Sequence, residues 1–396
     1  MHHFAFGVNL HDSASGVVRD QHSSVLQRQE TRNAGYAAGL DVLSIINEPT
    51  AAALAYGRTL HEDKKILVFD LGGGTFDVTI LDLREGEGLV VASDGADQLG
   101  GKDWDEVIMD YLYSEFRRRT GKDIPDDMGW EIQQLALRAK FDLTEHEETT
   151  VSISNDGADV EIILYRADPS GPASEYEFDM DTDRPFYFEE RSSNLLSLCR
   201  TFCIRVIEKA GLKWGDIDDI ILAGGACRMP MIPLMLEELV GRKVSKHIPG
   251  FSFDTAIAMG AALSCSRKHR IRDVTSKTIG VEVKINGRPY IEHLIQKNKP
   301  LPFMIEEDFK AESNAVLKVY EGESHVADEC ILRGRLELGN PEGSVKVTMN
   351  INNDGVLSSM VEFPPNERLE LNIRTDDEDI DLNELRLKIA GLDFRL

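Results

Sequence analysis

The sequence predicts an α/β domain followed by a smaller all-β domain. Two observations predict the first domain. A strand–glycine loop–strand unit occupies residues 66–80, and a strand–glycine loop–helix unit begins at Asp219. A third observation predicts the second domain, because near Arg267 helical periodicity gives way to short runs that alternate apolar and polar residues. The length of 396 residues also suggests at least two domains.

Composition limits the classes of function. The chain holds 44 basic against 69 acidic residues, a net charge of −25, so we expect neither nucleic acid nor an anionic membrane as a partner. Its five cysteines are scattered, which predicts a cytoplasmic protein without a disulfide framework. Cys199 and Cys203 lie four apart on an expected helix, but no further zinc ligands stand nearby. The sequence contains no run of eighteen apolar residues, so we expect no transmembrane helix.

The stretch from Ile66 to Ile80 is the most informative one. An apolar run ends at Asp70, then Gly72, Gly73, Gly74 and Thr75 follow before a second strand. Glycines allow a sharp turn, and successive N–H groups can then hold a phosphate. Asp70 at the end of the strand is a candidate to hold magnesium through water. An ordinary hairpin whose turn needs glycine is the alternative interpretation.

The stretch before this loop has a clear order from residue 25 onward. Residues 25–38 predict a helix ended by glycine, residues 42–46 a strand, and residues 48–56 a second helix. Glu48 stands at the start of the second helix. Its carboxylate either interacts favourably with the helix dipole or lies near a bound metal–nucleotide. Residues 1–24 show little periodicity and are expected to be a lead-in.

The second glycine loop follows a region of helices and strands. That region predicts helices at 101–118 and 128–141, strands at 149–154 and 160–164, a surface loop at 166–185 and a helix ending near 210. In the loop, Gly224 and Gly225 offer N–H groups at a helix N-terminus. Arg228 is suited to stack on a purine or to pair with a phosphate. Asp254 precedes a helix of small residues, 256–263, suited to close packing.

The β-rich region predicts an antiparallel sandwich. Its alternating runs are separated by turns such as Asn286-Gly287 and Asn353-Asp354-Gly355, which are strong hairpin signals. The expected strands are 278–284, 289–294, 315–321, 330–338, 345–351 and 356–363.

Several motifs in this order resemble the seventy-kilodalton heat-shock chaperone family of the DnaK type. The motifs are Gln27-Arg28-Gln29, Ile46-Asn47-Glu48-Pro49-Thr50 through Gly57, Asp70 through Asp77, Leu99-Gly100-Gly101 and Gly224-Gly225-x-x-Arg228-x-Pro230. The resemblance covers roughly residues 25–375. It implies an actin-like ATPase domain, incomplete at its N-terminus, followed by a peptide-binding β-sandwich.

The resemblance also implies roles for individual residues. Gly72, Gly73, Gly74 and Thr75 would contact the phosphates of ATP, and Gly101 would approach them from the other lobe. Asp70 and Glu48 would hold Mg through water and, with Thr75, form the catalytic group. The remaining residues expected to bind the nucleotide are Lys140, Thr144, Gly224, Gly225, Arg228 and Asp254.

In the sandwich, Val281, Phe309 and Leu317 match positions that line the family's peptide pocket. The alternative interpretation is that these three side chains are simply core. An extended peptide would gain main-chain hydrogen bonds and one apolar pocket. The partners implied by the resemblance are unfolded polypeptide segments, a J-domain co-chaperone and a nucleotide exchange factor.

We expect five segments: a lead-in at 1–24, the nucleotide-binding domain at 25–266, a linker at 267–277, the sandwich at 278–375 and an acidic tail at 376–396. Residues 1–24 do not resemble the family's first phosphate loop, and its catalytic lysine and helical lid have no counterpart here. The first hypothesis is an ATP-dependent chaperone. The alternative is a truncated or degenerate copy that binds nucleotide or peptide without hydrolysing ATP.

Overall fold

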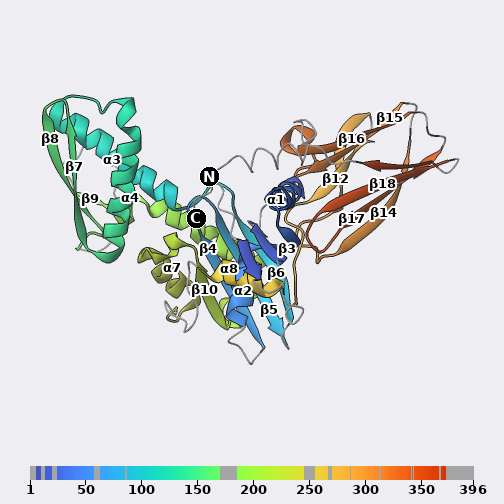
Figure 1. Cartoon of the computed structure of the whole chain (residues 1–396), viewed down its shortest axis with the longest axis horizontal. Helices are drawn as coiled ribbons and strands as arrows, with labels where there is room; N and C mark the ends of the chain where they lie inside the picture. The colour runs from blue at the N-terminus through green and yellow to red at the C-terminus, as the bar shows by residue number, and fades with distance from the viewer. Residues whose placement is uncertain are drawn as a thin grey trace. The chain divides into compact units, whose positions relative to one another are not determined.

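A computed structural model describes residues 6–9, 14–19, 25–57, 63–84, 87–169, 185–244, 255–265, 270–285, 287–311, 314–339, 341, 343–364 and 367–371. The chain divides into two compact units. Unit 1 comprises residues 1–68, 79–93 and 250–396, and unit 2 comprises residues 69–78 and 94–249. Figure 1 labels the helices and strands.

Two long helices and a β-hairpin form one part of unit 2 (Figure 1). Helix α3 (Gly101–Thr120) packs against α4 (Gly129–Glu145), and the hairpin of β7 (Glu148–Asn155) and β8 (Ala158–Tyr165) contacts both helices. The short strand β9 (Phe186–Tyr187) pairs with β8. The buried side chains of α3 recur every four residues, as expected for one face of an amphipathic helix. They are Trp104, Ile108, Leu112 and Phe116.

The rest of unit 2 contains helices α5 (Phe188–Arg191), α6 (Ser193–Lys209) and α7 (Met231–Val240). A five-stranded sheet of order β10-β4-β5-β6-β11 supplies strands to both units. Its strands are β4 (Lys64–Leu71), β5 (Phe76–Arg84), β6 (Glu87–Ala96), β10 (Asp219–Ala223) and β11 (Arg270–Arg272). Residues 66–69 of β4 are fully buried, which explains their continuous apolar run.

The first part of unit 1 is a three-stranded sheet with helices. Strand β1 (Phe6–Asn9) pairs antiparallel with β2 (Ala14–Arg19), and β2 pairs parallel with β3 (Asp41–Asn47). The weak periodicity of residues 1–24 gave no sign of β1 and β2, which lie in the segment expected to be a lead-in.

Three helices belong to this part of unit 1: α1 (Val25–Ala37), α2 (Glu48–Gly57) and α8 (Ala256–Ser264). Helices α2 and α8 pack very closely. A Cβ atom on Gly260 would lie 1.8 Å from the carbonyl oxygen of Ala51. The prediction of a closely packed helix of small residues is therefore confirmed.

The second part of unit 1 consists of two four-stranded antiparallel sheets, of order β13-β12-β15-β16 and β14-β17-β18-β19. Side chains from both sheets form one hydrophobic cluster. The predicted strands are present, and β14 and β19 add to them. The strands are β12 (Ile279–Ile285), β13 (Arg288–Ile295), β14 (Phe303–Lys310), β15 (Ala315–Glu321), β16 (Ile331–Gly339), β17 (Ser344–Ile351), β18 (Leu357–Phe363) and β19 (Glu367–Leu371).

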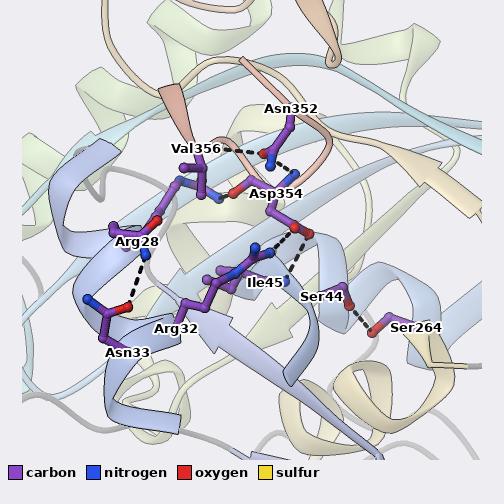
Figure 2. A network of polar contacts seen from close by, with 10 residues as sticks. Arg28, Arg32, Asn33, Ser44, Ile45, Ser264, Asn352, Asp354 and Val356 are labelled. Atoms are coloured by element: carbon purple, nitrogen blue, oxygen red, sulfur yellow. Dashed lines mark hydrogen bonds and ion pairs between the residues drawn. The ribbon is translucent and has the colours of Figure 1, made fainter. Parts of the chain in front are cut away.

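The turn between β17 and β18 contacts α1 and β3 (Figure 2). The carboxylate of Asp354 accepts hydrogen bonds from the guanidinium of Arg32 and, over 3.2 Å, from the backbone N–H of Ile45. The backbone carbonyl of Asp354 accepts from Nη1 of Arg28 at 3.2 Å. One aspartate therefore joins a helix and an edge strand to a turn more than 300 residues away.

Arg28 continues this network into the protein interior. Its side chain is 2% exposed, and it donates to the side chains of Asn47 and Ser276. Nδ2 of Asn47 donates in turn to Oδ1 of Asp273 at 2.7 Å. Burial raises the pKa of the Asp273 carboxyl, and the nearby Arg28 charge opposes that shift. The sequence motif that contains Arg28 is therefore built into a buried polar network.

Several expectations fall on residues outside the described ranges. These are Asp254, most of the loop at 166–185, the start of the linker at 267–269 and the acidic tail at 376–396.

Candidate functional site

The glycine loop of unit 2 lies between β4 and β5. Asp70, at the end of β4, is 4% exposed. The loop closes on itself because the N–H of Gly72 donates to the carbonyl of Thr75 at 3.0 Å. The predicted strand–turn–strand unit is confirmed, with the acid and the glycines at its tip.

Helix α3 holds this loop from the other side through backbone contacts. The N–H of Gly101 donates to the carbonyl of Gly72 at 2.9 Å, and that of Lys102 donates to the carbonyl of Gly73 at 2.8 Å. A Cβ atom on Gly100 would lie 2.4 Å from the backbone nitrogen of Gly74. Only glycine permits this approach, because real Cβ atoms do not come so close to backbone.

The loop's own donors remain available to a ligand. Among the described residues, the N–H groups of Gly73, Gly74 and Thr75 donate to no backbone carbonyl. The first turn of α3 is closed by its own cap, since Oδ2 of Asp103 accepts from the N–H of Gly100 at 2.6 Å. The donors free to bind an anion are therefore those of the loop rather than those of the helix end.

A buried ion pair supports the start of α3. Nζ of Lys140, on α4, lies 2.8 Å from Oδ1 of Asp105 and donates to the carbonyl of Gly101 at 2.6 Å. Both charged side chains are nearly buried, with exposed fractions of 8% and 12%. Burial raises the pKa of Asp105, and the Lys140 charge opposes that rise. The hydroxyl of Thr144 donates to the carbonyl of Lys140 at 2.9 Å, so both residues expected near the nucleotide already have partners within unit 2.

The second glycine loop packs against the end of β4. Gly224 has a φ of +81°, and a Cβ there would lie 2.3 Å from the carbonyl oxygen of Leu71 and 2.9 Å from Oδ1 of Asp70. A short turn of helix, residues 225–228, follows and leaves Arg228 exposed. The structure therefore brings the two predicted loops together around Asp70.

Two residues at this site were not among the predicted ones. Gly100 makes the tightest contact with the loop, and Lys102 lies along it. The Cδ and Cε atoms of Lys102 are 3.8 Å, and its Nζ 3.9 Å, from the position of a Cβ on Gly74. The sequence Gly-Gly-Lys at the start of the helix could have indicated both Gly100 and Lys102 as residues of the site.

The other predicted residues that the structure describes belong to unit 1. Glu48 is the first residue of α2 in unit 1. Val281 and Leu317 are 1% and 8% exposed and belong to the core of the two antiparallel sheets. Phe309 on β14 is only partly buried against that core and pairs with Val345.

Two further results concern metals and membranes. No group of three His, Cys, Asp or Glu side chains that could hold a metal ion occurs in the part of the chain that the structure describes. Within the same residues, no helix combines the length and apolar character needed to span a membrane. All five cysteines are free thiols.

Comparisons with known proteins agree on one family. The family model described as Hsp70 protein matches residues 24–380. The chaperone protein DnaK of Halobacterium salinarum is 35% identical over 352 residues, which cover 84% of this chain and 53% of that protein. The proteins of the same name from Thermosipho melanesiensis and Thermotoga maritima are 36% and 35% identical over 356 residues, covering 84% of this chain and 56% of theirs.

The chain spans about half the length of the curated relatives it matches. The similarity nevertheless includes both glycine loops and the two antiparallel sheets, since the match extends from residue 24 to residue 380. The chain belongs to the Hsp70 family.

Proposed function

We propose that the chain binds ATP with magnesium at the loop of residues 72–75 and acts as a chaperone for unfolded polypeptides. The observation that carries the proposal is the set of N–H groups of Gly73, Gly74 and Thr75, which donate to no backbone carbonyl of the described residues while α3 holds the loop's carbonyls. Successive N–H groups in such a turn form a concave anion site. The relatives' printed name, chaperone protein, supports the second part of the proposal.

The residues present fit ATP and magnesium. A side chain on Gly100 would collide with the loop and one on Gly224 with Leu71 and Asp70, so both glycines let backbone pack directly against the loop and the end of β4. Asp70 supplies the hard oxygen ligand that magnesium prefers, through water. Bound magnesium would neutralise part of the charge on the phosphates. The other residues that we assign to the nucleotide are Gly72, Glu48, Gly101, Lys140, Thr144, Gly225, Arg228 and Asp254.

Calorimetry with ATP and magnesium tests this proposal on the full chain. We expect binding at micromolar concentration or below in the wild type and none in Gly73→Asp. A Cβ on Gly73 meets nothing within 4 Å, so the aspartate fits the fold but places a negative charge at the phosphates. Gly73→Asn is the matched control, because it has the same size without the charge.

A folded wild-type chain that binds no ATP would contradict the proposal, and so would equal binding by Gly73→Asp. Circular dichroism checks that each variant is folded. Phosphate release by the same preparation then separates an ATPase, in which Thr75, Asp70 and Glu48 act at the reacting end, from a module that only binds.

The peptide site is proposed at Phe309, together with Val281 and Leu317 of the core against which it packs. Phe309 is only partly buried on β14, an edge strand that pairs with β17 on one side and with no other strand among the described residues. An edge strand offers main-chain hydrogen bonds to an extended peptide, and a partly exposed aromatic side chain offers an apolar contact.

A labelled, extended apolar peptide tests this site by fluorescence anisotropy on the full chain. We expect Phe309→Ala to weaken binding by about 10-fold, the usual effect of losing an aromatic anchor. Phe303→Ala is the control, because Phe303 lies on the same strand and also packs partly buried on the core. Equal loss in both variants, or no loss in Phe309→Ala, would mean that Phe309 is only a core residue.

The family resemblance extends the proposal to partners and location. We assign a J-domain co-chaperone and a nucleotide exchange factor as protein partners, and the cytoplasm as the location. The net charge of −25 supports the absence of nucleic acid and anionic membranes among the partners.

A further inference from the structure

Two lysines lie beside the glycine loop, and their charges are used differently. Lys140 is nearly buried and is neutralised by Asp105 at 2.8 Å. Lys102 is exposed, and the described residues give its side chain no ion pair and no hydrogen bond. Its charge is therefore available to a ligand at the loop.

The position of Lys102 is set by the backbone. Its own N–H donates to the carbonyl of Gly73 at 2.8 Å, which fixes the start of its side chain on the loop. The three terminal atoms Cδ, Cε and Nζ then lie beside Gly74, within 3.9 Å of the position that a Cβ on this glycine would take. Glu106 stands one helical turn further on, where a surface pair could form, yet no such pair is among the contacts of the described residues.

The geometry points to Lys102 as a phosphate-binding residue, whose ammonium group contacts the polyphosphate held by the N–H groups of residues 73–75. This inference rests on the proposed function of that loop. Backbone N–H groups carry only partial charges, and the buried Asp70 opposes an anion at the same place. A lysine on a flexible stem brings a full positive charge and can follow the phosphates as they bind.

The test compares three ligands on four full-length proteins by calorimetry: ATP with magnesium, adenosine, and inorganic tripolyphosphate. The proteins are the wild type, Lys102→Gln, Lys102→Arg and Lys122→Gln. Lys122 is the control because it is an exposed lysine after the far end of α3, paired with Asp156 at 3.0 Å. We expect Lys102→Gln to weaken ATP and tripolyphosphate binding by about 10-fold while adenosine binding stays unchanged.

Lys102→Arg is expected to restore binding to within about 3-fold of the wild type, because it keeps the charge. If Lys102→Gln binds ATP as tightly as the wild type does, the role of Lys102 is overturned and the nucleotide site stands. If the wild type binds tripolyphosphate through Lys102 but binds no ATP, the role of Lys102 stands and the proposed nucleotide function fails. If the folded wild type binds neither, both are overturned.

Discussion

Two glycine-containing turns of this chain use their polar groups in opposite ways. In the turn at residues 352–355, Oδ1 of Asn352 accepts from the N–H groups of Asp354 and Val356, both at 3.0 Å. The carboxylate and carbonyl of Asp354 accept from α1 and β3 (Figure 2). In the loop at residues 72–75, the carbonyls of Gly72, Gly73 and Thr75 and the N–H of Gly72 have backbone partners, whereas the N–H groups of residues 73–75 donate to no backbone carbonyl of the described residues.

The difference separates a structural turn from a ligand site. Buried backbone groups in folded proteins nearly always have partners, so a turn that bonds its own groups is complete. A loop that is tightly held yet keeps adjacent N–H groups available is organised for a partner that the protein does not supply. Glycine content alone would not distinguish the two, because both turns contain it.

The largest expected effect on stability and ATP binding comes from adding a side chain where the loop contacts the start of α3. In Gly100→Ala the new Cβ would lie 2.4 Å from the nitrogen of Gly74 and 2.6 Å from the carbonyl carbon of Gly73. The helix must then move away, which breaks the hydrogen bonds that hold the loop. We expect a loss of about 3 kcal/mol in the free energy of unfolding and no measurable ATP binding. Urea unfolding followed by tryptophan fluorescence and calorimetry measure the two effects.

Gly73→Ala is the matched control for this prediction, because a Cβ at that position meets nothing within 4 Å. We expect its free energy of unfolding to stay within about 0.5 kcal/mol of the wild type. If Gly100→Ala were as stable as Gly73→Ala, the close contact between the loop and α3 would not be needed for the fold.

The sequence predicted the elements better than the contacts between them. The helices at 25–37 and 101–120 and both glycine loops follow from local periodicity and turn chemistry, and the structure has them close to the expected bounds. Strand β14 was missed because the acidic run at residues 306–308 interrupts the alternation of Phe303, Ile305 and Phe309. A charged strand of this kind looks like a loop when only composition is visible.

Contacts between residues far apart in the sequence were the least predictable part. Lys140 and Asp105 lie 35 positions apart and Arg32 and Asp354 lie 322 apart, so no local pattern links either pair. The family resemblance implied Gly101 as the glycine near the phosphates, whereas its neighbour Gly100 makes the closer approach to the loop. Adjacent glycines carry the same local signal, and only the packing of α3 decides which one must lack a side chain.

A smaller effect is expected from the turn at 352–355, because the hydrogen bonds that Asp354 accepts from α1 and β3 are only partly buried. Asp354→Ala removes the acceptor of the Ile45 N–H, at the edge strand β3, together with the partner of Arg32. We expect a loss of about 2 kcal/mol, the usual range for hydrogen bonds to a charged group. Local opening should then speed amide hydrogen exchange at Ile45 by about 30-fold.

Asp354→Asn divides this effect into its parts, because the amide keeps an oxygen for the Ile45 N–H but loses the charge that pairs with Arg32. Its exchange rate at Ile45 should fall between those of the wild type and Asp354→Ala. Glu238→Ala, which removes an exposed ion pair with Arg200, is the control and should change stability by less than about 0.5 kcal/mol. Unchanged exchange at Ile45 in Asp354→Ala would show that the turn does not hold β3, and the contrast with the open loop would then rest on the loop alone.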